Sequence, residues 1–520
     1  MSISRRQFLS RVGQAGGYGA TFVLMQSLGL LPIAETAAES TLRLVDGKGK
    51  RVVILGAGIC GLVTAYELGK AGWSCTILEP RQRPGGRNWS IRKGTHVDFT
   101  DGTKQTCNFH EGQYFNAGPA RLPSLHRIML GYCHELGVAL EVEVNSSRSA
   151  LMQCDKLNGG APVEQRRVVN DTRGHVSGLL AKCIRKGALD EEIDADDRER
   201  MIEFLRQYGD LNADLLFKGT ERSGYSVDPG AMPQAPVFND PLPMHELLLN
   251  PEMWFRLLSE EVPDWQPTMF QPIGGMDHIP MAFAKKLGPV FRYGCEVRRI
   301  RQSDTGVTVN YRGAAGADET ITADYCVCAM PLTIARTLDA DFSTEIRAIM
   351  DSVQYDSAYK VAWDAPRFWE KEKNIFGGIS YLQQTVDAVW YPSAELFSER
   401  GVLIAGYSLE SIGASGKLPD PEAMITSSRR SVELLHAGHG KDLSSPVYIS
   451  WGRIPYNLGS WIGEGTRQHP AGSSLATLQR PDRRVYFAGD HTSHLVGWQE
   501  GAALSAHRVI NQLGERIQSA

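Results

Sequence analysis

The hydrophobic pattern predicts a strand, a tight turn, a helix and a second strand in immediate succession near the start of the chain. Residues 51–55 are a β-branched apolar run that ends at a glycine, which is typical of a buried parallel strand. After a glycine-rich turn, residues 62–72 have the periodicity of a helix that stops at its last glycine. Residues 74–78 form the next apolar run, and Glu79 follows it. The pattern is that of a compact βαβ unit.

The rest of the chain divides into a helical middle and a region rich in strands. Residues 123–258 favour helices, among them a charged amphipathic stretch over residues 196–210. One helix is expected to begin after residues 271–276, and the last helix is expected over residues 498–517. Between residues 346 and 446 the pattern is mixed. Strands are expected over residues 290–293, 296–300, 306–311, 325–329 and 484–490.

The first 38 residues are expected to be a twin-arginine export signal. The adjacent Arg5 and Arg6 precede a weakly apolar stretch over residues 16–31, and small residues follow at 36–38. A basic amphipathic segment or a membrane anchor is the alternative, but the apolar stretch is interrupted and short for the ~20 residues that a transmembrane helix needs. We therefore expect a periplasmic or secreted protein, with no stable membrane span elsewhere in the chain.

Composition and charge exclude several classes of protein. The chain has 520 residues, 42% hydrophobic and 22% charged, as in an ordinary globular protein of several domains. The 55 Lys and Arg residues face 59 Asp and Glu residues, and this balance gives no electrostatic footprint for nucleic acid. The nine cysteines show no zinc-ligand spacing, so no metal site is expected. Most are expected in the core, with Cys326 and Cys328 on one face of a strand.

The turn after the first strand carries the glycine spacing of a dinucleotide-binding motif. Gly56 permits the tight turn, Gly58 lets the backbone approach a pyrophosphate, and Gly61 lets the helix lie close to the strand. The N-terminus of the helix offers free N–H groups to phosphate. Glu79 is placed to accept hydrogen bonds from the adenosine ribose, and its charge disfavours a 2′-phosphate. The motif indicates NAD or FAD rather than NADP.

Two further motifs resemble signatures of the FAD-dependent amine oxidase superfamily. Residues 83–87, Arg-Pro-Gly-Gly-Arg, follow Glu79, and residues 487–490, Phe-Ala-Gly-Asp, lie near the C-terminus. In that superfamily the first motif extends the phosphate cradle and the second brings an acid to the ribityl chain, whereas NAD dehydrogenases lack this pairing. The resemblance implies that the cofactor is FAD, with Arg87 and Asp490 in these two roles.

A third segment resembles L-amino-acid oxidases. Residues 118–123, Gly-Pro-Ala-Arg-Leu-Pro, correspond to the segment whose backbone lines the flavin ring and whose arginine, here Arg121, grips the substrate carboxylate. The parallel N–H donors of a guanidinium group match the planar carboxylate of an amino acid. Oxidases of simple amines have no such requirement. Arg121 is therefore the residue that distinguishes acid-bearing substrates from plain amines.

The resemblance continues through the second half of the chain, in order and approximate spacing. It implies that Lys360 holds a water against the flavin N5 atom, that Tyr407 is a second carboxylate ligand and that Trp390 lines the pocket. It also implies that Trp498 is an aromatic wall beside the substrate, at a helix start whose N–H groups stabilise negative charge on the flavin. The matching segments are residues 357–361, 366–370, 377–378, 390–392, 405–407 and 496–503.

The resemblance thus implies two sets of site residues. The catalytic residues are Lys360, Arg121, Tyr407 and Trp498, and the substrate-binding residues are Arg121, Tyr407, Trp390, Gly497 and Trp498. The flavin-binding residues are Gly56, Ala57, Gly58, Gly61, Glu79, Pro80, Arg81, Gly86, Arg87, Gly118, Pro119, Ala120, Arg121, Val297, Gly489, Asp490, Gly497, Trp498, Gln499 and Ala502. Monoamine oxidases attach their flavin through a cysteine in the C-terminal third. Because no cysteine follows Cys328, the FAD is expected to be bound non-covalently.

The expected fold is α/β with two domains. A Rossmann-like FAD-binding domain is interrupted by an inserted substrate-binding domain of mixed sheet and helices at residues 341–449, and residues 126–267 form a helical substrate region. The match is weakest over residues 148–267. The FAD-binding domain is expected over residues 48–125, 268–340 and 450–520.

The resemblance implies oxidative deamination of L-α-amino acids to 2-oxo acids, with ammonia and hydrogen peroxide released and dioxygen as the acceptor. A homodimer is the expectation for bacterial L-amino-acid oxidases, and Trp390 and Trp498 favour large apolar or aromatic substrate side chains. Three alternatives stay open. They are an amide-forming, decarboxylating amino-acid 2-monooxygenase, an amine or polyamine oxidase of the same fold, and a flavoprotein that passes electrons to a membrane partner or has no turnover.

Overall fold

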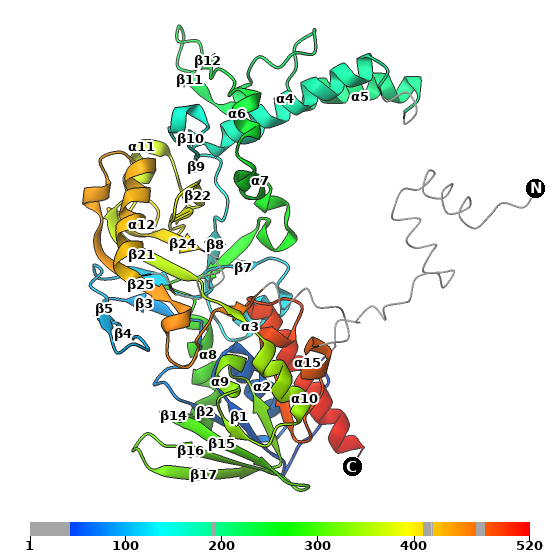
Figure 1. Ribbon diagram of the computed structural model, residues 1–520, viewed down its shortest axis with the longest axis vertical. Helices are drawn as coiled ribbons and strands as arrows, with labels where there is room; N and C mark the ends of the chain where they lie inside the picture. Colours follow the sequence, from blue (N-terminus) through cyan, green and yellow to red (C-terminus); the bar gives the residue numbers. More distant parts are fainter. Residues whose placement is uncertain (1–41, 189–192, 409–417, 419, 464–473, 520) are drawn as a thin grey trace, which may run out of the picture.

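The computed structural model describes residues 42–188, 193–408, 418, 420–463 and 474–519. The export signal expected over residues 1–38 lies outside them. A parallel sheet occupies one half of the molecule and a larger mixed sheet the other, and a pair of helices projects from the end opposite the C-terminus (Figure 1). The two sheets match the mixed α/β architecture that the sequence predicts.

The parallel sheet collects five strands from three distant parts of the chain. Its order is β14-β2-β1-β18-β27, and every neighbouring pair is parallel. Because the carboxyl ends of parallel strands meet at one edge, the segments that follow β1, β2 and β27 converge there. The strands are β1 Arg51–Leu55, β2 Ser74–Glu79, β14 Phe291–Tyr293, β18 Tyr325–Cys328 and β27 Val485–Phe487.

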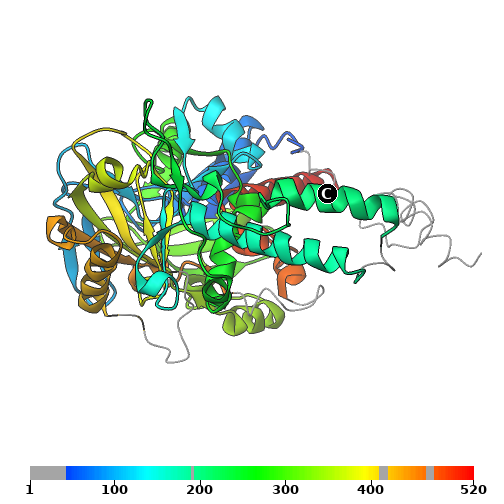
Figure 2. The ribbon, with the colours of Figure 1, turned by 90° about the horizontal axis from the view of Figure 1, so that it is seen from above.

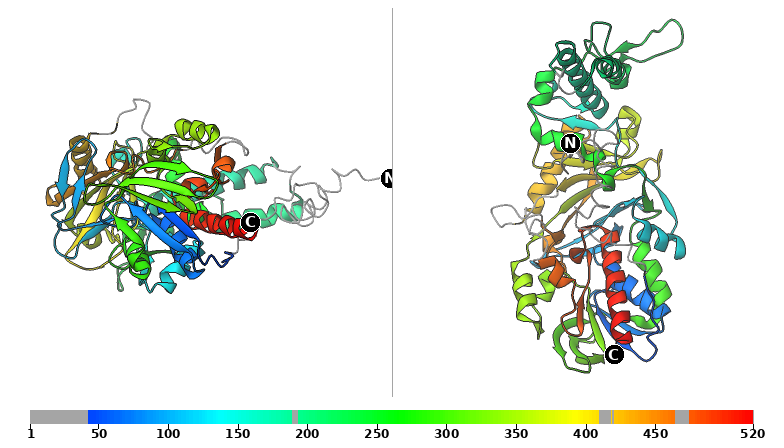
Figure 3. Two further views of the ribbon diagram at one scale, coloured as in Figure 1. Left: turned by 90° about the horizontal axis from the view of Figure 1, so that it is seen from below. Right: turned by 90° about the vertical axis from the view of Figure 1, so that its right-hand side faces the viewer.

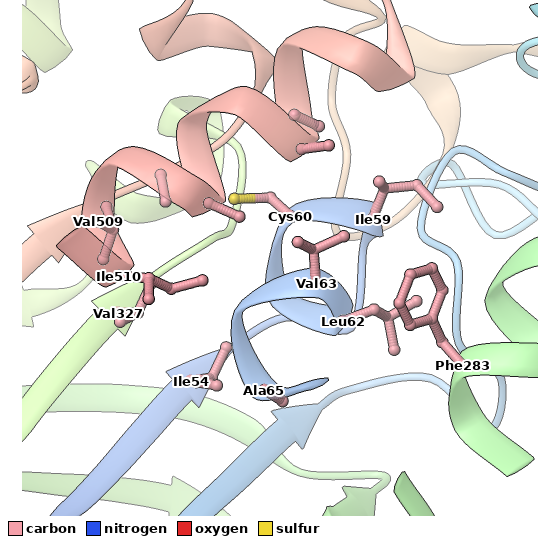
Figure 4. Close-up of a cluster of buried hydrophobic side chains, with 14 of the residues drawn as sticks. Ile54, Ile59, Cys60, Leu62, Val63, Ala65, Phe283, Val327, Val509 and Ile510 are labelled. Carbon is pink, nitrogen blue, oxygen red and sulfur yellow. The ribbon is translucent and has the colours of Figure 1, made fainter. Parts of the chain in front are cut away.

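Helices cover one face of this sheet. Ile54 of β1 and Val327 of β18 belong to one buried cluster with Val63 of α2 (Ile59–Lys70) and Val509 of α15 (Gln499–Gln518), as Figure 4 shows. The two helices lie side by side along the sheet, with α15 in red in Figure 3. Helix α2 begins earlier than the periodicity predicts because Gly58 acts as its N-cap.

The opposite face is covered by a second sheet, in which β15, β16 and β17 are antiparallel to their neighbours and the short β19 pairs parallel with β15. Val53 and Leu55 of β1 and both Cys326 and Cys328 of β18 point into this cluster, so the predicted shared face of the two cysteines is confirmed. The covering strands are β15 Glu296–Gln302, β16 Val307–Arg312 and β17 Asp318–Ala323. Strand β17 was not predicted, because an exposed edge strand of charged and threonine residues lacks the apolar alternation that is typical of buried strands.

The larger mixed sheet has the order β10-β9-β22-β23-β24-β21-β25. One face lies on helix α12 (Pro421–Leu435) in a buried aromatic and aliphatic cluster. The other face belongs to the cluster that contains Trp390 and Trp451. The strands are β9 Leu151–Gln153, β10 Val163–Glu164, β21 Tyr359–Pro366, β22 Ile379–Leu382, β23 Ala388–Trp390, β24 Arg400–Ser408 and β25 Ser444–Ser450.

The middle segment is less helical than its pattern suggests. Helices α4 (Gln165–Arg185) and α5 (Ala195–Tyr208) form the projecting pair, seen from above in Figure 2, and α5 confirms the predicted amphipathic stretch. However, β8 (Leu140–Glu143), β9 and β10 also come from this segment. Such two- to four-residue strands are too short to show a period of their own.

Shorter elements connect these layers. Among the described residues, no helix is both long enough and apolar enough to cross a membrane. The remaining strands are β3 Ser90–Arg92, β4 His96–Asp98, β5 Lys104–Thr106, β6 Tyr114–Asn116, β7 Leu122–Pro123, β11 Tyr225–Val227, β12 Val237–Phe238, β13 Met269–Pro272, β19 Asp339–Ala340, β20 Tyr355–Asp356 and β26 Trp461–Ile462. The remaining α-helices are α3 Arg127–Glu135, α6 Met244–Leu248, α7 Pro251–Leu257, α8 His278–Leu287, α9 Leu332–Ala335, α10 Thr344–Ser352, α11 Phe368–Lys373 and α14 Ser474–Leu478.

Candidate active site

A cavity of about 610 Å³ extends from the carboxyl edge of the parallel sheet to strands β21, β23 and β24 of the mixed sheet. Its lining brings together residues from one end of the chain to the other, from Gly56 to Ala502. All site residues implied by the resemblance line this cavity except Ala57 and Gly61. Ala57 and Gly61 are direct chain neighbours of the lining residues Gly56, Gly58 and Cys60.

The glycine-rich turn has the geometry that its spacing predicts. Gly56 has a φ of +102°, which favours glycine, and a Cβ atom on Gly61 would lie 2.1 Å from the Gly56 carbonyl oxygen. Gly58 has nothing within 4 Å of a built Cβ position, so its backbone faces open space in the cavity. The close contact of Gly61 and the open face of Gly58 fit the two roles that the motif assigns.

Glu79 is fixed at the tip of β2. It is 2% exposed, and its two carboxylate oxygens accept the Ala57 N–H at 2.9 Å and the Arg81 N–H at 3.0 Å. The Ala57 N–H thus helps to orient Glu79. A carboxylate held by two backbone donors keeps further lone pairs for hydroxyl groups in the cavity.

The cavity fits a flavin dinucleotide. Helices α2 and α15 both begin at its wall, and no side chain caps either N-terminus, so their first N–H groups are free to bind phosphate or developing negative charge. The only acid in the first turn of α15, Glu500, is engaged elsewhere, with the N–H groups of Ile128 and Met129. The donors and the Glu79 acceptor together match a group with a pyrophosphate and a ribose.

Arg87 and Asp490, which the resemblance gives separate roles, form an ion pair in the cavity wall. The Arg87 guanidinium donates to both Asp490 oxygens, one of them at 3.2 Å, and to the Ser460 carbonyl. The Gly497 N–H also donates to Asp490, at 2.9 Å. Burial alone would raise the pKa of Asp490, but Arg87 and this N–H lower it below its ordinary value. Asp490 is thus a fixed anion beside the start of α15.

Arg121 lies at the other end of the cavity, just before β7, and is 8% exposed. Its guanidinium carbon lies 4.6 Å from the Trp265 ring centre and 4.8 Å from that of Trp390, with Trp498 at 5.8 Å. One nitrogen donates to the Asn145 side-chain oxygen at 2.6 Å. Within the described residues no carboxylate forms an ion pair with Arg121, so its other N–H groups can bind an anion that enters the cavity.

Lys360 also lines the cavity, with its Nζ atom 5.7 Å from the Trp390 ring centre, and is paired in register with Tyr407 of β24. Its ammonium donates to the carbonyl oxygens of Asn116, at 2.8 Å, and Gly118, at 2.6 Å. Burial, and then the charge of Arg121, lower the pKa of Lys360 to about 7. Burial also raises the pKa of Tyr407, which therefore stays protonated near neutral pH. The site thus contains a permanent cation, a lysine that changes charge near neutrality and a phenol.

Several residues of the site escape prediction from the sequence. Trp265 and Asn145 contact Arg121 directly, and Trp451 donates to the Ala117 carbonyl oxygen at 3.2 Å in the cavity wall. Trp265 lies in the stretch where the resemblance is weakest. A single tryptophan or asparagine in a loop carries no periodicity, so no local signal identifies them.

Two cysteines, Cys60 and Cys295, line the main cavity. All nine are free, and all but Cys75 and the exposed Cys183 are buried. No group of three or more potential metal ligands is found in the parts of the chain that the structure describes.

The chain is similar to known flavoproteins. A model of the family described as flavin containing amine oxidoreductase matches residues 59–512. The chain is 25% identical over 485 residues to an L-amino-acid oxidase of Demansia vestigiata, covering 90% of this chain and 88% of that protein. It is 27% identical over 478 residues to an L-amino-acid oxidase of Siganus canaliculatus, covering 89% and 85%.

Two solved structures share its fold. Cyclohexylamine oxidase from Brevibacterium oxydans IH-35A gives a TM-score of 0.59 at 17% identity, covering 90% of this chain and 99% of that one. Putrescine oxidase bound to putrescine gives a TM-score of 0.56 at 18% identity, covering 91% and 99%. The expected α/β fold is therefore confirmed.

Proposed function

Because the chain belongs to the flavin containing amine oxidoreductase family, we propose that it is an FAD-dependent L-amino-acid oxidase. The reaction converts an L-α-amino acid to a 2-oxo acid, with release of ammonia and hydrogen peroxide. The observation that carries this proposal is Arg121, a buried guanidinium without an ion-pair partner among the described residues, held between Trp265 and Trp390 in the cavity. The names of the relatives at about a quarter identity support the same substrate class.

We propose that the FAD is held without a covalent bond. Glu79 would bind the adenosine ribose, the N-terminus of α2 the pyrophosphate, and Asp490 and the start of α15 the flavin half. No cysteine follows Cys328 in the sequence. When bound, the flavin supplies a two-electron oxidant that dioxygen regenerates.

The residues of the chain bind, orient and enclose the substrate. Arg121 holds the carboxylate through parallel N–H donors, and Tyr407 supplies a hydroxyl donor as a second ligand. With the carboxylate fixed, only one enantiomer places its α-hydrogen toward the flavin half of the cavity. The Lys360 amine, neutral above about pH 7, can accept a proton at Nζ from a bound water. Trp390 and Trp498 exclude water and favour large apolar side chains.

An anaerobic titration tests this proposal. The purified holoenzyme is mixed with L-phenylalanine, D-phenylalanine or phenylethylamine, and the visible flavin absorbance is followed. We expect bleaching by the L-amino acid alone, and loss of that response in Arg121→Ala but not in Arg312→Ala, an exposed arginine of β16. Bleaching by phenylethylamine alone would make the protein an amine oxidase. Product analysis of the same reaction run in air separates the monooxygenase alternative, because formation of an amide with loss of CO2 in place of a 2-oxo acid would make the protein a 2-monooxygenase. A flavin that none of the three reduces would favour an electron carrier.

We further propose that residues 1–38 direct export through the twin-arginine pathway and that the enzyme is a homodimer. The double variant Arg5→Lys, Arg6→Lys should leave the protein inside the cell that makes it, as measured by fractionation. Sedimentation of the purified enzyme should give twice the mass of one chain.

A further inference from the structure

Glu143, the last residue of β8, is a buried acid near the Arg121 guanidinium and the Trp390 indole. Glu143 is 4% exposed, and neither of its carboxyl oxygens accepts a hydrogen bond of standard geometry from any described residue. Burying an unpaired carboxylate is costly, so an acid in this setting is normally protonated or serves a function. The reaction described above does not use it.

Glu143 lies close to the strands and side chains that position Arg121, the residue proposed to bind the substrate carboxylate (the carboxylate clamp). Met269 of β13 pairs with Glu143 on one side and with Pro123, two residues after Arg121, on the other. Asn145, two residues beyond Glu143, is the hydrogen-bond partner of Arg121. Residues 143–145 therefore include both Asn145, the neutral side chain that accepts a hydrogen bond from Arg121, and Glu143, an acid close to Arg121.

A second, small cavity of about 70 Å³ is lined by Glu143 and shares Ala120 and Trp390 with the main cavity. Its volume exceeds the roughly 10–15 Å³ that one water needs, so water can carry a proton to the carboxyl group. The wall between the two cavities is the wall on which Arg121 rests. The exposed Glu395 also lines this small cavity, so water in it connects Glu143 with the protein surface, and Glu143 does not line the main cavity.

The other charged groups around this small cavity are already engaged. Arg367 donates to Glu370 and to the carbonyl oxygens of Ala394 and Arg400. Glu395 is exposed and accepts from the Gln113 side chain. Tyr114 and Tyr391 also line the cavity, and burial raises the pKa of both phenols, so they stay neutral. The cation that acts on Glu143 is therefore Arg121.

Both protonation states of Glu143 are accessible near neutrality. Burial raises its pKa to about 7, while the charge of Arg121 and the nearby Trp390 indole oppose that rise. When a carboxylate ligand occupies Arg121, a second negative charge lies close to Glu143 in a region of low dielectric. The repulsion between the two anions favours protonation of Glu143.

We propose that Glu143 is a positioning residue for Arg121 whose protonation is linked to substrate binding. Glu143 is ionised when no carboxylate is bound to Arg121, and it is protonated when a substrate carboxylate binds there. The proposal rests on the proposed function, because it requires a carboxylate on Arg121. One proton is taken up from solvent for each carboxylate bound at pH values where Glu143 is ionised in the free enzyme. As the pH rises above that range, the uptake becomes unfavourable and carboxylate affinity falls.

Calorimetry with a carboxylate that cannot be oxidised tests the proposal. Benzoate is titrated into the FAD-loaded enzyme at pH 8 in two buffers of different ionisation enthalpy, which gives the number of protons taken up. We expect close to one proton in the wild type and close to none in Glu143→Gln, which still binds benzoate. The wild-type dissociation constant should rise with pH above about 7, by up to tenfold per unit, and that of the variant should stay flat.

Lys360 is the necessary control, because it also titrates near neutrality and would also bind a proton beside a carboxylate. Lys360→Met should keep the proton uptake that Glu143→Gln loses. The reverse result would assign the uptake to Lys360 and overturn the proposal. A second readout needs no variant, since the infrared difference spectrum of the wild type on benzoate binding should gain a protonated carboxyl band. Its absence would contradict the proposal.

Benzoate binding distinguishes an error about Arg121 from an error about Glu143. If benzoate does not bind, or binds equally well to Arg121→Ala, the proposed carboxylate clamp is wrong. If benzoate binding requires Arg121 but the uptake is absent or survives in Glu143→Gln, only the role of Glu143 is wrong.

Discussion

The two ends of the main cavity are built in different ways. The dinucleotide end is made of backbone, with glycines, two uncapped helix starts and one acid held by backbone N–H groups. The Arg121 end is made of side chains from separate segments, namely a loop, a short strand, the middle region and the mixed sheet. Backbone geometry suits a cofactor whose phosphates and ribose do not vary, whereas side chains can be exchanged to change the substrate. Variants at each end should therefore fail in different ways.

The largest effect is expected at the dinucleotide end. In Gly61→Ala the new Cβ would lie 2.1 Å from the Gly56 carbonyl oxygen, so α2 must move away from the turn. We expect loss of most bound flavin and a loss of stability of about 1–3 kcal/mol or more. The matched control is Gly69→Ala in the exposed part of the same helix, where nothing lies within 4 Å. It should retain its flavin. The flavin absorbance and the thermal midpoint measure both variants, and equal flavin content would contradict the packing argument.

At the Arg121 end, Arg121→Lys should damage catalysis and spare the cofactor. Lysine keeps the charge but loses the planar pair of donors and the stacking between Trp265 and Trp390. We expect kcat/KM for L-amino acids to fall about 100-fold, equivalent to about 2.7 kcal/mol, with flavin content unchanged. Steady-state peroxide formation provides the measurement. A lysine variant with wild-type kcat/KM would show that charge alone suffices.

The pH profile should separate two residues at the same end. The pKa of Lys360 is lowered to about 7, so its neutral form accumulates above that pH and kcat/KM should rise with pH up to it. Glu143 ionises in the same range and should make kcat/KM fall at higher pH. The wild type should therefore give a narrow, bell-shaped pH profile, in which kcat/KM changes by up to tenfold per pH unit on each side of the maximum. Lys360→Met should lose the acid limb and Glu143→Gln the alkaline limb. Variants that keep both limbs would refute these assignments.

The smallest effect is expected from a substitution of Trp265, which packs against the Arg121 guanidinium. Trp265→Leu removes one of the two rings that flank the Arg121 guanidinium, a contact worth about 0.5–2 kcal/mol, so KM should rise about 3- to 30-fold with little change in kcat. Trp254→Leu, at a half-exposed tryptophan of α7 that does not line the cavity, is the control. Equal KM values in the two variants would remove Trp265 from the site.

The same contrast explains what could be predicted from the sequence. The turn at Gly56 and Gly58 and the acid at Glu79 lie within one βαβ unit, so spacing alone identifies them. Arg121, Lys360 and Tyr407 were found only through resemblance to a family, since nothing local marks them as neighbours. Trp265, Asn145 and Glu143 were not found at all. They reach the site through the pairing of β13 with β7 and β8, which no sequence pattern reveals.

The most direct test of the carboxylate clamp is the ratio of kcat/KM for L-phenylalanine to that for phenylethylamine, in the wild type and in Arg121→Ala. The two substrates differ only in the carboxylate. A large ratio in the wild type that collapses in Arg121→Ala, through loss of activity on the amino acid, is the predicted result. A ratio that Arg121→Ala leaves unchanged would contradict the account, because the carboxylate would then be held elsewhere or not at all.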